Sequence, residues 1–372
     1  MTRPKLLNGD VRQVLSELEP ESVQCVVTSP PYWGLRDYGT ATWKGGDENC
    51  EHEGILLGNN RNFIDREGRG SNKKSISSGD CVKCGAKRID AQLGLEPTPD
   101  EYVKNMVDVF REVKKVLRKD GTLWLNIGDN YFGGGRGEDR KYKEAHDSVE
   151  NSKPDWSKIK GLKPKDLVGI PWRVALALQA DGWWLRNDII WSKPNPMPEP
   201  VKDRLTKSHE YIFLLTKSKT YYYDHESIKE PYSESSIQRI NQVTFDKQTG
   251  GKKDYGKVSV HSKNTNSIRG TLEKFKENLG SGRNRRTVWE LVTRSYPEAH
   301  FATFPEEIPE LCIKAGTKAG DLVLDPFVGS GTTCAVASRL GRESIGIELN
   351  EEYLKLARKR CKVESESLLK YV

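Results

Sequence analysis

The sequence has no apolar run that approaches the ~20 residues of a membrane-spanning helix. Its first residues, MTRPKLLNGD, also lack the apolar stretch of a secretory signal peptide. The seven cysteines are an odd number and are scattered along the chain, which argues against a disulfide framework. These absences predict a cytoplasmic protein with no membrane partner, in which 372 residues form one large domain with insertions or two domains.

The excess of positive charge is confined to one segment. The chain has 60 Lys or Arg against 53 Asp or Glu, a net charge of +7. Residues 217–286 hold 15 Lys or Arg and 8 Asp or Glu, so this segment carries the whole excess. A basic segment rich in Ser, Asn and Gly predicts binding to a polyanion, with DNA or RNA as first candidates. A solvated basic loop is the alternative.

Strand and helix patterns alternate along much of the remaining chain, which predicts an α/β sheet. Strands are expected near 6–10, 23–27, 122–129, 183–191 and 211–215, in a run that begins at 322, and near 344–348. Helices are expected near 11–18, 99–117, 170–179 and 308–315.

A polar insertion at 43–95 interrupts this alternation. It contains Cys50-x-His52 and Cys81-x-x-Cys84, two closely spaced pairs of metal-ligand residues. Three thiolates and an imidazole can form a closed tetrahedral zinc site, which has no open position for catalysis. An insertion with few apolar residues needs such a staple, so the spacing predicts a structural zinc. Four unrelated loop residues are the alternative.

The stretch Thr28-Ser29-Pro30-Pro31-Tyr32 follows the apolar run 23–27. Two consecutive prolines force an extended, rigid loop that offers carbonyl acceptors but no N–H donors of its own. With an aromatic ring beside it, such a loop suits a flat group that bears an exocyclic amine. A plain turn at the end of a strand is the alternative.

A second stretch, Asp325-Pro326-Phe327-Val328-Gly329-Ser330-Gly331-Thr332-Thr333, reads as the end of a strand, a glycine turn and the start of a helix. Glu348 ends the next predicted strand, as in β-α-β units that bind nucleotides, where such an acid holds ribose hydroxyls. The stretch lacks the Lys-Ser/Thr pair of a Walker loop and the GxGxxG spacing for dinucleotides. A tight strand-to-helix turn is the alternative.

In this order, with the basic segment between them, TSPPY and DPFVGSGTT resemble a β-class DNA amino-methyltransferase that uses S-adenosylmethionine. The resemblance implies a circularly permuted, Rossmann-like methyltransferase sheet formed by 1–42, 96–216 and 287–372. It also implies that 217–286 is a loop-rich target-recognition region, while the zinc-binding insertion at 43–95 is extra to the family's minimal core.

The resemblance assigns roles to individual residues. Ser29, Pro30, Pro31 and Tyr32 would hold the target amine, and the 191–198 segment with Asn195 would flank the flipped base. Arg283, Arg285 and Arg286, in the basic segment, would contact DNA. The cofactor would lie among Asp10, Phe304, Pro305, Asp325, Phe327, Gly329, Ser330, Gly331, Thr332 and Glu348.

The resemblance implies methylation of the exocyclic amine of a flipped base in double-stranded DNA. Methylation of cytosine C5 would need a cysteine nucleophile, typically after proline, and the chain has no Pro-Cys pair. In the family that this chain resembles, serine at the first loop position is commoner in enzymes that act on cytosine N4, so the resemblance favours cytosine. Adenine N6 is the first alternative, ahead of an RNA methyltransferase and an inactive DNA-binding homologue. The sequence leaves open a homodimer and a cognate restriction enzyme.

Overall fold

The computed structural model describes residues 3–34, 40–47, 49–52, 56–59, 74–76, 80–132, 161–240, 282–293 and 304–363. Contacts divide the chain into two units. The larger comprises Met1–Tyr223 and Thr287–Val372, and the smaller comprises Asp224–Arg286. In the larger unit's described part, no helix is both long and apolar enough to cross a membrane, and the same holds for the smaller.

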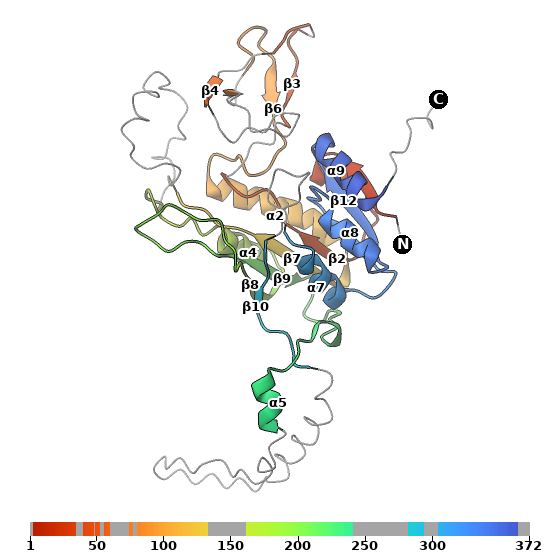
Figure 1. Ribbon diagram of the computed structural model, residues 1–372. Helices are drawn as coiled ribbons and strands as arrows, with labels where there is room; N and C mark the ends of the chain where they lie inside the picture. Colours follow the sequence, from red (N-terminus) through yellow and green to blue (C-terminus); the bar gives the residue numbers. More distant parts are fainter. Residues whose placement is uncertain are drawn as a thin grey trace. The chain divides into compact units, whose positions relative to one another are not determined.

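The larger unit is built on an eight-stranded sheet with the order β1-β12-β11-β2-β7-β9-β8-β10 (Figure 1). Strand β9 runs antiparallel to both of its neighbours, and the other pairs are parallel. The strands are β1 (Lys5–Asn8), β2 (Val23–Thr28), β7 (Leu117–Ile127), β8 (Trp184–Ser192), β9 (His209–Thr216), β10 (Val288–Glu290), β11 (Leu322–Asp325) and β12 (Glu343–Glu348).

Helices cover both faces of this sheet, so the central strand β2 is buried along all six residues. One layer contains α1 (Val11–Ser16), α2 (Pro99–Val116) and α4 (Ile170–Ala180), and the other contains α7 (Glu307–Gly316), α8 (Thr332–Arg339) and α9 (Glu351–Cys361) (Figure 1). The fold confirms the predicted α/β sheet.

The helix α2 follows from simple sequence signals. Thr98 caps it by accepting a hydrogen bond from the backbone N–H of Glu101 at 3.2 Å, and Pro99 occupies its first turn. Its apolar face, which includes Tyr102, Met106 and Phe110, is fully buried against the sheet. Burial of each large side chain contributes about 1.5–3 kcal/mol.

The first and last strands of the sheet lie side by side. Leu7 pairs with Ile347 and Asn8 with Glu348 in a parallel ladder. The chain therefore enters the sheet beside the strand with which it finishes, as the expected circular permutation requires.

The strand expected near 122–129 begins earlier in the structure, and Asp120-Gly121 lies in a bulge within it. Strand β7 begins at Leu117, directly after α2, and its register against β2 shifts between Val23 and Cys25. Gly121 packs so closely that a Cβ there would lie 2.6 Å from the Leu117 side chain. The residues between Leu117 and Thr122 have no paired partners in β2 and form an irregular part of β7. A sequence pattern alone indicates an interruption of regular structure there.

The insertion contributes two short antiparallel pairs, β3 (Thr42–Lys44) with β6 (Lys87–Ile89) and β4 (Leu56–Asn59) with β5 (Lys74–Ile76). The smaller unit contains the 3-10 helix η2 (Glu226–Ile228) and α5 (Glu234–Ile240). Most of the basic segment, 241–281, lies outside the described residues.

Candidate active site

A cavity of about 850 Å³ opens where the parallel strands end. Its wall includes Ser29 after β2, Pro326 after β11 and Leu349 after β12. In open α/β sheets ligands bind at this edge, because the loops that leave the strands converge there. The two stretches singled out in the sequence thus face one common space.

The proline loop after β2 is fixed at several points. The hydroxyl of Thr28 donates to Asp325 Oδ1 at 2.7 Å, which joins the loop to the glycine turn after β11. The hydroxyl of Tyr102 donates to the Pro31 carbonyl at 2.9 Å, and the indole of Trp33 donates to the Glu96 carbonyl at 2.9 Å. The loop is therefore a rigid part of the cavity wall.

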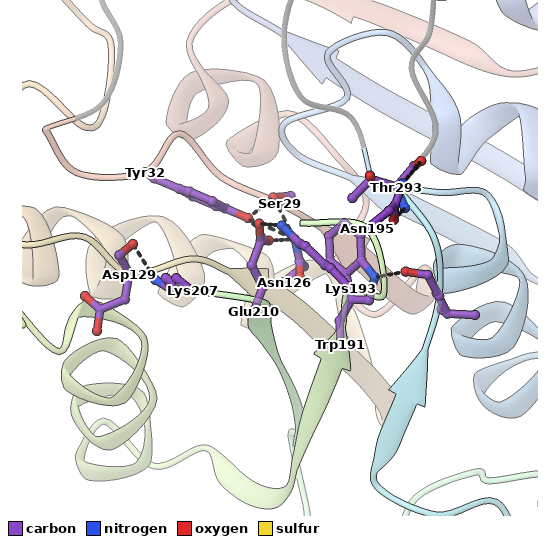
Figure 2. A network of polar contacts seen from close by, with 11 residues as sticks. Ser29, Tyr32, Asn126, Asp129, Trp191, Lys193, Asn195, Lys207, Glu210 and Thr293 are labelled. Carbon is purple, nitrogen blue, oxygen red and sulfur yellow. Dashed lines mark hydrogen bonds and ion pairs between the residues drawn. The ribbon is translucent and has the colours of Figure 1, made fainter. Parts of the chain in front are cut away.

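A polar network contributes to the cavity lining, and Figure 2 shows its side chains. The Tyr32 hydroxyl donates to Glu210 Oε2 at 2.7 Å and lies 3.2 Å from Ser29 Oγ. The Asn126 amide donates to Tyr32 at 2.9 Å and to Glu210 at 3.1 Å. The Tyr32 ring lies against Gly128, where a Cβ would be 2.5 Å from ring atom Cε2.

Two lysines also belong to this site. Lys193 forms an ion pair with Glu210 and lies 4.3 Å from the centre of the Trp191 ring. Lys207 donates to the Asp129 carbonyl, and burial lowers the pKa of its ammonium group. Both lysines line the cavity together with their acceptors, Glu210 and Asp129.

The glycine turn after β11 is held by its own acids. Asp325 Oδ1 accepts from the Phe327 N–H at 3.1 Å, and Glu348 Oε2 accepts from the Gly329 N–H at 2.9 Å. Gly331 has φ +84°, and a Cβ there would lie 3.0 Å from Ala357 Cα. Only glycine allows both this backbone conformation and the close approach of α9.

Burial raises the pKa of the Asp325 carboxyl to about 6 and that of Glu348 to about 7. Glu348 also accepts the Asn350 N–H at 2.9 Å through Oε1, which partly opposes this rise. A ligand that donates hydroxyl hydrogens to Glu348 would favour its ionised form.

Most of the residues expected around a cofactor line this cavity: Asp10, Phe304, Asp325, Phe327, Gly329, Ser330, Thr332 and Glu348. Asp10 also caps α1, where its carboxylate accepts the Arg12 N–H at 2.8 Å and pairs with the Arg12 guanidinium. Pro305 and Gly331 stand behind the wall and support it, since Pro305 is buried and accepts the Ile308 N–H at the start of α7.

Comparison with known proteins identifies the family. The sequence model of the DNA methylase family matches residues 23–359. The chain is 42% identical to the Type II methyltransferase M.SmaI of Serratia marcescens, covering 96% of this chain and 90% of that protein. It is 40% identical to M.Cfr9I of Citrobacter freundii, covering 98% and 90%. The chain belongs to the DNA methylase family.

It is therefore a site-specific DNA amino-methyltransferase of the N4/N6 class, as the two motifs implied. The fold of PvuII DNA methyltransferase, titled cytosine-N4-specific, is similar, with a TM-score of 0.54 at 17% identity over 97% of this chain and 86% of that one. This likeness confirms the predicted methyltransferase fold.

The four predicted zinc ligands of this methylase come together. The ligand atoms of Cys50, His52, Cys81 and Cys84 all lie within 4.8 Å of one another. Cys50 Sγ is 3.9 Å from Cys81 Sγ, and Cys84 Sγ is 3.2 Å from His52 Nδ1. A tetrahedral zinc with thiolates at about 2.3 Å separates its ligand atoms by about 3.7 Å, so the donor set fits that ion.

The predicted DNA contacts are engaged within the chain. Asn195 exchanges two hydrogen bonds with the backbone of Thr293, at 3.2 and 3.0 Å. In the smaller unit, Arg283 and Arg286 pair with Glu230. Arg285 donates to the Ile228 carbonyl at 2.9 Å. These residues hold their own segments together, and any role on DNA would be additional.

Sequence reasoning missed Asn126, Lys207 and Glu210 of the methylase, and it included Lys193 only as part of the 191–198 segment. One signal was present in the sequence. The polar residues His209 and Glu210 directly precede the apolar run 211–215, and they are the first residues of β9, at the edge of the sheet that faces the cavity. Cys25 is buried within β2, and burial raises the pKa of its thiol to about 12, so it is part of the core.

Proposed function

We propose that this methylase transfers a methyl group from S-adenosylmethionine to cytosine N4 of a base flipped out of duplex DNA. The observation that carries the proposal is the single cavity that contains both the proline loop at Ser29 and the glycine turn at Asp325. A target amine and a methyl donor bound at these two loops would meet inside one water-excluding site.

Eight of the ten residues proposed for the cofactor line the cavity. Glu348 would accept ribose hydroxyls, while the turn from Asp325 to Thr332 would surround the methionine end, with Phe304 beside it. Bound there, the cofactor supplies an electrophilic methyl group on a sulfonium. Its adenine would lie near Asp10, at the end of β1.

The residues proposed for the target amine, Ser29, Pro30, Pro31 and Tyr32, line the same cavity. Ser29 Oγ and the Pro30 carbonyl would accept hydrogen bonds from the target amine and turn its lone pair toward the methyl donor. Positive charge grows on the nitrogen during transfer, so these acceptors stabilise the transition state more than the ground state. The Tyr32 ring would stack on the flipped base, a contact worth about 1–3 kcal/mol.

Cytosine is favoured over adenine because the first position of the proline loop is Ser29, and serine at this position is commoner in family members that act on cytosine N4. Adenine N6 is the alternative. The deciding experiment digests DNA methylated by the purified protein and identifies the modified nucleoside by mass spectrometry. N4-methyldeoxycytidine supports the proposal, and N6-methyldeoxyadenosine supports the alternative. The absence of both products would contradict both hypotheses.

We also propose a structural zinc in the insertion, bound by Cys50, His52, Cys81 and Cys84. Four ligands close the site, so the ion would stabilise the insertion and take no part in transfer. The basic segment 217–286 would follow the phosphate backbone and help to recognise the target sequence. A restriction enzyme of the same sequence specificity would be a functional partner, and dimerisation is a matter for measurement in solution.

A further inference from the structure

In the polar network beside the proline loop, the donor and the acceptor of each hydrogen bond can be assigned. Tyr32 has one hydroxyl hydrogen, and the 2.7 Å distance to Glu210 Oε2 is typical of donation to a carboxylate. Tyr32 must then accept from its other neighbours, Ser29 at 3.2 Å and the Asn126 amide at 2.9 Å. The Ser29 hydrogen therefore points at Tyr32. One lone pair of Ser29 Oγ accepts from the Asn126 amide at 3.3 Å, and the other is available to the cavity.

Glu210 is held as a carboxylate at the far end of this chain of hydroxyls. Its side chain is 15% exposed and contacts Lys193, whose side chain is 19% exposed. Strands β8 and β9 are antiparallel and pair Trp191 with Glu210, so Lys193 follows two residues beyond the paired position. A partly buried carboxylate needs such a cation to remain charged.

Methylation of an amine releases a proton that must leave the closed site. The nitrogen lone pair forms the new N–C bond, the electrons of the C–S bond remain on sulfur, and one N–H proton must be lost to restore a neutral amine. A general base within hydrogen-bond reach contributes about 10²–10⁴-fold to such a step.

We propose that Glu210 is the final acceptor of this proton, reached through Ser29 and Tyr32. The inference rests on the proposed amine methylation. The amine proton moves to Ser29 Oγ, the Ser29 hydroxyl proton moves to the Tyr32 oxygen, and the Tyr32 proton moves to Glu210 Oε2, which becomes a neutral carboxylic acid. Each oxygen keeps one proton except the carboxylate, which gains one, and solvent later removes it.

In this relay Tyr32 accepts one proton from Ser29 and donates its own proton to Glu210. Burial, with the neighbouring Glu210 charge, raises the pKa of its hydroxyl well above the ordinary value. A free tyrosinate is therefore disfavoured, and Tyr32 must gain one proton as it passes on another. Asn126 keeps the two oxygens in place, because its amide donates to both Tyr32 and Glu210.

The test compares Glu210→Gln, Tyr32→Phe and the double variant in single-turnover methylation of duplex DNA. Gln keeps the size and a hydrogen-bonding oxygen but takes no proton, and Phe keeps the ring. Each single variant should lower the rate about 10²-fold or more. The double variant should be no slower than the worse single variant, because the residues act as one unit. Glu112→Gln, a lysine-paired glutamate on the surface of α2, is the matched control.

Two further readouts separate proton transfer from positioning. The wild-type rate should fall in D2O, and Glu210→Gln should lose this solvent isotope effect although Lys193, Lys207, His209 and Tyr32, the neighbours of Glu210, are all retained. DNA affinity and the fluorescence of 2-aminopurine at the target position should stay at wild-type values in both single variants.

A wild-type rate in either single variant would overturn the relay, as would an unchanged solvent isotope effect in Glu210→Gln. A loss of the 2-aminopurine signal in Glu210→Gln would also overturn it, because Glu210 would then bind the base. If the wild-type protein itself forms no N-methylated base, the proposed function fails and not merely the relay.

Discussion

Cofactor binding should depend on pH through Glu348. Its carboxyl has a pKa of about 7 in the free protein because it is buried at the end of β12. Ribose hydroxyls donate to the ionised form, so binding requires loss of the proton and weakens as pH falls through 7. About nine-tenths of the groups are ionised at pH 8 and about one-tenth at pH 6, so the dissociation constant should rise about tenfold, or ~1.4 kcal/mol.

Isothermal titration of S-adenosylmethionine at pH 8, 7 and 6 measures this dependence. Glu348→Gln should bind more weakly at pH 8 and lose the tenfold change, while any titration of the ligand itself remains common to both proteins. Glu343→Gln, at the exposed start of the same strand, should retain the wild-type profile. Asp325, with a pKa of about 6, adds a further loss only toward the acid end. A pH-independent wild-type constant, or a profile unchanged by Glu348→Gln, would refute the role of Glu348.

Three further outcomes are expected. Ser29→Ala should lower the single-turnover rate about 10²–10³-fold and leave cofactor affinity unchanged, since it removes an acceptor aimed at developing charge; an unaffected rate would contradict the assigned role. Metal analysis should find about one zinc per chain, which is lost in a Cys81→Ser, Cys84→Ser double variant; a folded, metal-free wild type would contradict the zinc site. Replacing Arg283, Arg285 and Arg286 by Gln should weaken DNA binding and lower the slope of log affinity against log salt by up to about 2.7. An unchanged slope would show that these arginines serve only the internal contacts seen at Glu230 and Ile228.

The two loop motifs could be predicted from sequence because their chemistry is local. Consecutive prolines at 30 and 31 exclude regular structure, and Gly331 permits a turn that other residues resist. The order of the motifs along the chain then implied the permuted sheet, which the pairing of Leu7 with Ile347 confirms.

The polar network could not be predicted in the same way. Asn126 comes from β7, Glu210 from β9 and Lys193 from the end of β8. Their meeting depends on the antiparallel register of β9, and a slip of one residue would turn Glu210 to the opposite face. A single sequence contains no signal for that register. The three polar residues at the ends of apolar runs therefore look like ordinary strand ends, and nothing in the sequence indicates that they meet.

The position of the insertion at 43–95 has a physical reason in the contacts of the proline loop. The Gly34 N–H donates to the Gly94 carbonyl at 2.8 Å, so the two ends of the excursion lie together. Gly94 has φ +94°, and a Cβ there would lie 2.8 Å from the Tyr32 carbonyl oxygen. The C-terminal end of the excursion, at Gly94, therefore packs directly on the proline loop. Long excursions between adjacent ends cost little additional closure entropy. The chain can thus carry an insertion next to Tyr32 without displacing it, provided that glycine remains at this junction.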